Sequence, residues 1–156
     1  MVVIRRAVPS DAERIHRIHV DSIRVLCARD YSAEQVESWV RFRGVEDYRR
    51  ALESGEMNWV AMVDGVVAGY ATFVRDELTA LFVEPGWARR GVGKSLIETV
   101  EQHARELGLK ELFLQSTRTA RLFYERLEYE ALAEEVYVLP DGVGVNCIKM
   151  IKKMTA

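Results

Sequence analysis

Cysteine is scarce in this sequence of 156 residues, with Cys27 and Cys147 far apart and outside any CxxC pattern. Two cysteines do not make a disulfide framework, and they offer too few soft ligands for a structural zinc site. The histidines lie in stretches that predict helices, and no third ligand accompanies His16 and His19 on their shared face. We therefore expect no metal site.

An excess of positive charge is also lacking, since 22 Lys and Arg stand against 24 Asp and Glu for a net charge of −2. Proteins that bind nucleic acid broadly need a basic face to displace counterions, so we expect no nucleic-acid partner. No apolar run approaches the ~20 residues that cross a bilayer, and residues 1–6 hold no apolar signal core. The sequence thus predicts a cytoplasmic protein with no membrane partner.

Hydrophobic periodicity predicts a single α/β (α+β) domain over residues 1–156, with a mixed central sheet. The segment around Asp64-Gly65 reads as a hairpin, because this pair supplies the positive φ values of a tight turn. Both hairpin strands are apolar on both faces, so we expect helices on both faces of the sheet. The predicted strands are 2–8, 59–63, 66–74, 78–83, 111–115, 129–139 and 144–150, and the predicted helices are 10–28, 31–40, 46–52, 91–107 and 118–128.

The most informative segment is the loop Ala88-Arg89-Arg90-Gly91-Val92-Gly93-Lys94, which lies between a predicted strand and a predicted helix. The first helical turn leaves amide N–H groups unpaired, and the helix dipole adds partial positive charge there. Glycines let a phosphate approach the backbone, and the three cationic side chains suit an anion. The pattern is neither GxxxxGK[ST] nor GxGxxG. A diphosphate is the simplest ligand, and a plain strand-to-helix turn is the alternative.

Two motifs resemble those of the GNAT superfamily of N-acetyltransferases. Val83-Glu84-Pro85 followed by Gly91-Val92-Gly93 is similar to the family's motif A, which has Val-x-Pro and then Gln/Arg-x-x-Gly-x-Gly/Ala. The stretch 119–129 resembles the family's Asn-Ala-x-x-Phe-Tyr-Glu-x-x-Gly-Phe. The order of predicted elements matches the family along almost the whole chain, so the resemblance implies the GNAT acyl-CoA N-acyltransferase fold.

Three positions depart from the family pattern. Ala88 stands where Gln or Arg is usual, so its backbone amide remains available but a side-chain contact is lost, and Arg89 is the expected replacement. Thr119 replaces the Asn, which weakens an expected contact to the pantetheine arm. Glu128 replaces a Gly, which affects how the last helix leads into the next strand.

The resemblance implies that the chain moves the acetyl group of acetyl-CoA to a primary amine by direct attack in a ternary complex. It assigns residues 57–116 to the acetyl-CoA-binding core, 1–56 to a helical part that sets acceptor specificity, and 117–156 to a C-terminal helix and hairpin. The acceptor would be a small-molecule or peptide amine, and the protein a monomer or homodimer. The implied cofactor-binding residues are Leu81, Phe82, Val83, Ala88, Arg89, Arg90, Gly91, Val92, Gly93, Lys94, Thr119 and Phe123.

Two residues are candidates for proton transfer. Tyr124 matches the family tyrosine that protonates the departing thiolate, and a phenol with a pKa near ~10 is a credible donor to it. Its alternative role is a core aromatic beside Phe123. Glu77 lies in the register of the catalytic glutamate of the histone acetyltransferase branch, and strand parity predicts that it shares a face with Leu81 and Val83. A solvated charge at Glu77, with a water chain as base, is the alternative.

The family also implies that the strand over 78–83 is splayed from its neighbour by a bulge, which frees N–H groups for the ligand. Polar or aromatic candidates for the acceptor pocket are Ser22, Arg24, Cys27, Tyr31 and Trp39, and a packing or surface role is the alternative for each. Two other functions fit the sequence. One is a non-catalytic acyl-CoA-binding or sensor domain, and the other is a protein-interaction module whose basic loop contacts an acidic partner.

Overall fold

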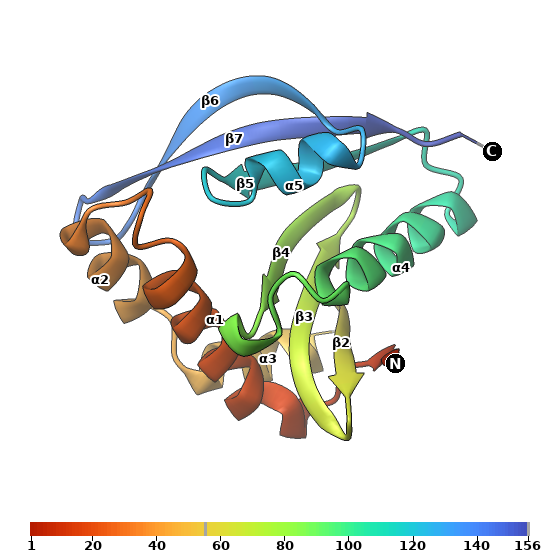
Figure 1. The fold of residues 1–156 in the computed structure, drawn as a ribbon, viewed down its shortest axis with the longest axis horizontal. Helices are drawn as coiled ribbons and strands as arrows, with labels where there is room; N and C mark the ends of the chain where they lie inside the picture. Colours follow the sequence, from red (N-terminus) through yellow and green to blue (C-terminus); the bar gives the residue numbers. More distant parts are fainter. Residues whose placement is uncertain (55, 156) are drawn as a thin grey trace.

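A computed structural model describes residues 1–54 and 56–155 (Figure 1). The N-terminal part consists of β1 (Val2–Arg6), the 3-10 turn η1 (Pro9–Asp11), α1 (Ala12–Leu26), α2 (Ala33–Arg41) and α3 (Val45–Glu53). The remainder consists of β2 (Met57–Val63), β3 (Val66–Val74), β4 (Glu77–Val83), η2 (Pro85–Trp87), α4 (Val92–Glu106), β5 (Glu111–Thr117), α5 (Arg121–Arg126), β6 (Glu130–Val138) and β7 (Gly144–Lys153).

The strands form a seven-stranded sheet in the order β1-β2-β3-β4-β5-β7-β6. Neighbouring strands run antiparallel except β4 and β5, which are parallel. Among the described residues this parallel pair is joined only at Glu77 opposite Phe113 and Leu78 opposite Leu114, so the two strands diverge beyond Leu78. The predicted splay is present, and it opens the sheet along the rest of β4.

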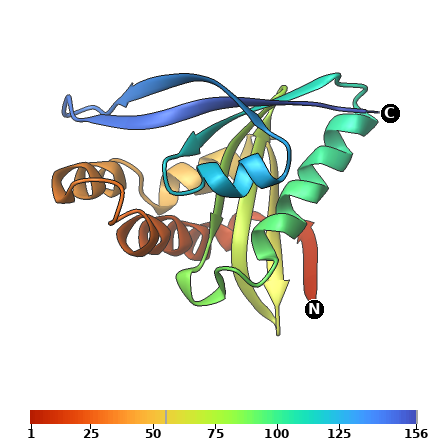
Figure 2. The same ribbon diagram turned by 45° about the horizontal axis from the view of Figure 1, so that its top comes forward.

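Helices cover both faces of the sheet, as the sequence predicted. Figure 2 shows α1 and α4 on opposite sides of β2–β4. The stripe of Val92, Leu96 and Val100 buries α4 against one face, and Ile15 and Ile18 bury α1 against the other. The β2–β3 turn has positive φ at Asp64 and Gly65, as a tight Asp-Gly turn requires.

A bulge on β4 decides which side chains face each layer. The pairing of β3 with β4 shifts at Thr79, which has no partner on β3. Leu78 and Leu81 therefore belong to the same core cluster, although they are three residues apart. Glu77 consequently lies on the face opposite Leu81, and the parity prediction that they share a face is wrong because it assumed an unbroken strand.

Helix α5 is shorter than the predicted span of 118–128. The backbone N–H of Arg118 donates to the Tyr31 hydroxyl at 2.9 Å instead of entering the helix. At the other end Glu128 has a φ of 73°, which stops the helix. These two features limit the helix to Arg121–Arg126.

Candidate functional site

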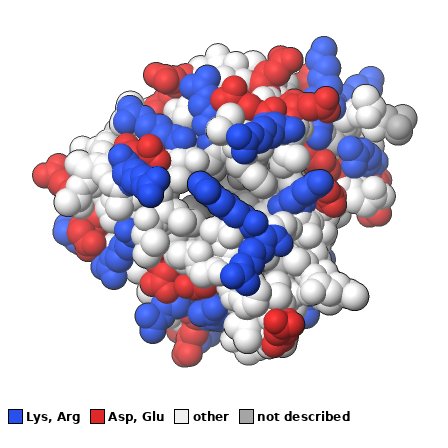
Figure 3. Space-filling view, viewed as in Figure 1, with Lys and Arg blue, Asp and Glu red and all other residues white. Residues whose placement is uncertain are grey.

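A cleft of about 1720 Å³ lies where β4 and β5 diverge. Figure 3 shows lysine and arginine side chains around a hollow in the middle of this face. The lining comes from α1 and the loop after it, α2 and the loop after it, β4, the loop before α4 and its first turn, the end of β5, α5 and the β6–β7 hairpin. Segments far apart in the sequence thus face one space.

The predicted diphosphate loop forms one end of this cleft, which we call the cofactor end. Ala88, Gly91 and Gly93 line it, and Gly91 precedes α4 with a φ of 83°. A Cβ added at Gly93 would lie 3.3 Å from Cζ of Phe123, which lines the same cleft. Val92 is 1% exposed and packs in the core, so only its backbone is available to a ligand. Glycine therefore keeps the first turn of α4 open to a ligand.

The cations of this loop divide into two groups. Arg89 and Lys94 line the cleft, whereas the Arg90 guanidinium lies over the Trp87 ring at 5.3 Å and is not among the described lining residues. Arg89 has a φ of 62°, a left-handed conformation that is costly outside glycine. Arg126 of α5 adds a cation that the sequence gave no reason to select, because it lies outside the family motif's named positions.

The exposed edge of β4 runs along the middle of the cleft. The N–H of Glu84 donates to the Ala68 carbonyl of β3 at 2.8 Å. Because hydrogen-bonding directions alternate along a strand, Leu81 and Val83 direct their backbone groups away from β3. The Ser22 hydroxyl donates to the Val83 carbonyl at 2.6 Å, which anchors α1 to this edge. The N–H groups of Leu81 and Val83 are thus directed toward the cleft.

Tyr124 lies beside this edge with its ring buried. The ring packs between Phe123 and Tyr129, at centroid distances of 5.1 and 5.7 Å. Tyr129 is itself fixed by donating to the Glu101 carboxylate at 2.7 Å. The hydrogen bonds of the described residues include none at the Tyr124 hydroxyl, and burial raises the pKa of Tyr124 far above its ordinary value. The phenol therefore stays protonated and lines the cleft.

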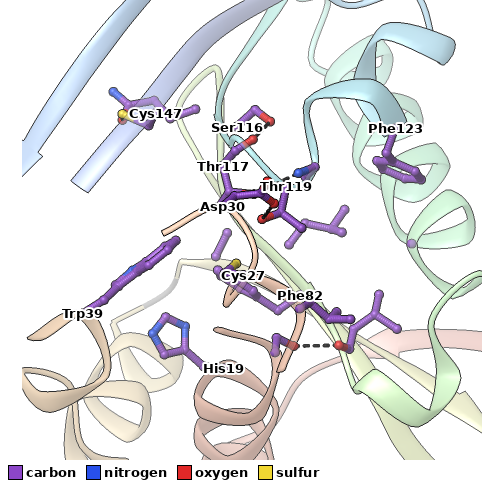
Figure 4. A pocket seen from close by; sticks show the side chains of 18 of the residues that line it. His19, Cys27, Asp30, Trp39, Phe82, Ser116, Thr117, Thr119, Phe123 and Cys147 are labelled. Atoms are coloured by element: carbon purple, nitrogen blue, oxygen red, sulfur yellow. Dashed lines mark hydrogen bonds between the residues drawn. The ribbon is translucent and has the colours of Figure 1, made fainter. Parts of the chain in front are cut away.

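Thr119 connects two loops across the cleft (Figure 4). Its hydroxyl donates to the Asp30 carboxylate at 2.7 Å, and the nearby Tyr31 hydroxyl donates to the Asn146 carbonyl at 2.6 Å. Cys27 also lines this region, and burial raises the pKa of its thiol, which disfavours the thiolate. The residue that replaces the family's Asn thus ties the α1–α2 loop to the β5–α5 loop.

Glu77 does not join these groups. Thr79 to Val83 of β4 line the cleft, and Glu77 is absent from the described lining. Of the acceptor-pocket candidates, Ser22, Cys27 and Trp39 line the cleft, whereas Arg24 pairs with Glu37 at 3.1 Å on the outside.

The second end of the cleft, which we call the acceptor end, is formed largely by α1 and α2. His19, which sequence analysis assigned only to a helix face, is buried there with Nδ1 3.3 Å from the Tyr70 hydroxyl. Burial, followed by the charges of Arg43 and His16, lowers the pKa of His19 to about 3. The imidazole is therefore neutral at physiological pH.

A family model described as an acetyltransferase (GNAT) domain matches residues 27–154. The chain belongs to this family. Membership makes it an acetyl-CoA-dependent acyltransferase, as the two sequence motifs predicted. In the described part of the chain, no helix has the length and apolar character needed to cross a membrane.

Known GNAT proteins resemble the chain over nearly its full length. A GCN5-related N-acetyltransferase from Rhodopseudomonas palustris is 30% identical, with a TM-score of 0.91 over 97% of this chain and 94% of that one. The PaiA N-acetyltransferase of Thermoplasma acidophilum, solved with coenzyme A, is 22% identical, with a TM-score of 0.71 over 98% and 99% of the two chains. YafP of Escherichia coli K12, described as an uncharacterized N-acetyltransferase, is 22% identical over 134 residues, covering 86% of this chain and 85% of YafP. The predicted GNAT fold is confirmed.

Proposed function

We propose that this chain transfers the acetyl group of acetyl-CoA to a primary amine by direct attack in a ternary complex. The observation that carries the proposal is that one continuous cleft runs from the glycine loop of α4, past the free edge of β4 and Tyr124, to α1 and α2. Two ligands entering from opposite ends would meet beside β4. Holding them in line supplies much of the acceleration that such a reaction needs.

The cofactor end suits the diphosphate of acetyl-CoA. The unpaired N–H groups of the first turn of α4 and the side chains of Arg89 and Lys94 offer hydrogen bonds and positive charge. The presence of coenzyme A in the similarly folded Thermoplasma protein supports this assignment. From there the pantetheine arm would follow β4, where the N–H groups of Leu81 and Val83 can hold the arm and polarise the thioester carbonyl.

The amine nitrogen attacks the thioester carbon, the C–N bond forms, and the C–S bond then breaks. Tyr124 donates its proton to the departing sulfur, which leaves as coenzyme A thiol. Burial raises the pKa of the phenol, but it also disfavours the thiolate beside it, so the proton transfer remains feasible. Because Glu77 is absent from the described lining, we assign removal of the ammonium proton before attack to water in the open cleft. The nitrogen loses its second proton to the Tyr124 phenolate as the amide forms, which restores the phenol.

The replacement Tyr124→Phe tests this proposal, because it keeps the ring between Phe123 and Tyr129 and removes only the hydroxyl. We expect kcat to fall about 10²- to 10³-fold, with little change in the KM for acetyl-CoA. The measurement is release of free thiol from acetyl-CoA with a panel of primary amines. Tyr137→Phe removes a hydroxyl elsewhere in the lining and is the matched control.

Two results would contradict the proposal. Binding of acetyl-CoA without turnover of any amine would favour the sensor function. A thermal-shift titration in which acetyl-CoA leaves the melting temperature unchanged at millimolar concentration would remove the cofactor assignment as well.

A further inference from the structure

Aromatic rings surround the acceptor end of the cleft. Its lining includes His19 of α1, Trp39 of α2, Phe42 after α2 and Phe82 of β4. Figure 4 shows His19, Trp39 and Phe82 around one space. Two of these rings are held by edge-on contacts, His19 to Phe82 at 4.9 Å and Trp39 to Tyr31 at 5.3 Å. The walls are thus aromatic and fixed before any ligand binds.

Aliphatic side chains complete this lining. Leu139 and Pro140 of the β6–β7 turn and Val145 of β7 contribute to the cleft, and Leu139 and Val145 share a core cluster with Trp39 and Phe82. Burying an apolar group of the acceptor against these surfaces is favourable by about 25 cal/mol per Å². The lining therefore favours an acceptor that carries an apolar group.

Charge at this end is balanced. Asp30 and Asp47 line it together with Arg29 and Arg43. Both carboxylates already accept hydrogen bonds at 2.7 Å, Asp30 from Thr119 and Asp47 from the backbone N–H at the start of α3. Because two carboxylates stand beside two guanidinium groups, neither a polyamine nor a dicarboxylate would find a net opposite charge from these four side chains. The cofactor end differs, because Arg89, Lys94 and Arg126 line it.

The buried imidazole fits an ammonium group. Since burial holds the pKa of His19 at about 3, its ring carries no positive charge at neutral pH and does not repel a cation. The face of an aromatic ring attracts an ammonium group by about 0.5–2 kcal/mol, and tryptophan is the best such ring.

We infer that the acceptor is a primary amine on an aromatic or bulky apolar group, with the ammonium as its only charge, and that Trp39 selects it. This inference rests on the proposed function, and it specifies the chemistry of the acceptor. Trp39 is suited to the role because it lines the cleft from α2, is only partly buried, and is fixed by its contact with Tyr31.

The test compares 2-phenylethylamine and tryptamine with spermidine and glutamate as acceptors. We expect kcat/KM to be at least about tenfold higher for the two aromatic amines, the range that one apolar contact supplies. Trp39→Ala should raise the KM for 2-phenylethylamine about 10- to 100-fold without changing the KM for acetyl-CoA, and Trp39→Phe should retain most of the affinity. Trp87→Ala, outside the described lining, should leave the KM for the amine unchanged.

The outcomes separate this inference from the proposed function. Preferred acetylation of spermidine or glutamate, or an unchanged KM in Trp39→Ala, overturns the inference and leaves acetyl transfer to amines standing. If no amine is acetylated, calorimetry with protein saturated in coenzyme A decides. Binding of 2-phenylethylamine that Trp39→Ala abolishes then supports the inference although the proposed function fails, and absence of binding overturns both. Thermal unfolding of each variant confirms that it folds.

Discussion

The two ends of the cleft are built by different means. The cofactor end is formed by backbone N–H groups at the start of α4, by glycines, and by positively charged side chains. The acceptor end uses aromatic and aliphatic side chains from helices and a hairpin turn, with charges of both signs. In the proposed function, the first end would hold any ligand that presents a diphosphate, whereas the second would select the acceptor by shape and apolar surface.

The two ends also differ in how far apart their residues lie in the sequence. Val83 to Lys94 is one continuous segment that makes most of the cofactor end. By contrast, the contact of Thr119 with Asp30 spans 89 positions, and that of Tyr70 with His19 spans 51. A ligand site made from one continuous segment, such as the cofactor end, can be shared by many proteins. A site assembled from several segments, such as the acceptor end, can change in sequence without disturbing the cofactor end.

The largest effect on stability that we expect concerns the buried imidazole of the acceptor end. Folding lowers the pKa of His19 from 6.5 to about 3, so the unfolded chain binds a proton that the native protein does not bind between these values. Above pH 6.5 neither state binds this proton, so His19 does not make stability depend on pH there. As the pH falls below 6.5, the unfolded state binds the proton and the native state loses stability. We expect about 3 kcal/mol less unfolding free energy at pH 4 than at pH 7 from this residue.

Chemical denaturation at pH 7, 6, 5 and 4 measures this loss. His19→Phe keeps a ring beside Phe82 and cannot titrate, so its unfolding free energy should fall less steeply over the same range. Equal slopes for the wild type and His19→Phe would show that the imidazole does not stay neutral in the native state.

The cofactor end should instead be sensitive to a single added methyl group. Gly93→Ala places a Cβ 3.3 Å from Cζ of Phe123 and in the path that we propose for the diphosphate, so we expect coenzyme A affinity to fall about 10- to 100-fold, or 1.4–2.7 kcal/mol. The unfolding free energy should change little, because the preference of the helix for alanine over glycine, about 1 kcal/mol, offsets the close contact with Phe123. Calorimetry measures the affinity.

Gly86→Ala is the matched control on the same loop, since an added Cβ there meets no described atom within 4 Å. Equal affinities for Gly93→Ala and the wild type would mean that the ligand does not approach the first turn of α4.

Removing each cation of the loop should weaken coenzyme A binding to a degree that depends on whether its side chain lines the cleft. Arg89→Ala and Lys94→Ala should each weaken coenzyme A binding about three- to tenfold, and more at low ionic strength. Arg90→Ala should have less than about twofold effect, because its guanidinium lies over Trp87. Titrations at two salt concentrations measure the difference. An Arg90 effect equal to that of Arg89 would place the phosphates nearer to Trp87.

Sequence reasoning succeeded where local pattern determines structure. The Asp64-Gly65 turn and the start of α4 at Gly91 both depend on backbone conformations that residue type dictates. The prediction of which face of β4 Glu77 occupies was wrong, because the unpaired Thr79 changes the side-chain alternation of β4 and periodicity alone cannot reveal a bulge. His19 was missed for a different reason, since its burial comes from packing against Phe82 and Tyr70, which are distant in the sequence.

The smallest effect concerns the last departure from the family pattern, Glu128. Its φ of 73° is left-handed, which costs a residue with a side chain about 1–2 kcal/mol, while glycine carries an entropic cost of about 0.5–1 kcal/mol. Glu128→Gly should therefore raise the unfolding free energy by about 0.5–1 kcal/mol in chemical denaturation. Glu125→Gly, inside α5, should lower it by about 1 kcal/mol. Stabilisation by both changes, or by neither, would contradict the conformational explanation.

Glu128→Gly should also leave kcat and the KM for acetyl-CoA unchanged. The side chain of Glu128 is exposed and lies outside the described lining, and the backbone N–H of Glu128 already donates to Glu125 at 3.0 Å in the conformation that glycine prefers. Tyr124 would keep its place against Tyr129, because neither ring has to move. The departure at Glu128 would then cost stability alone, and it would give no support to a non-catalytic function.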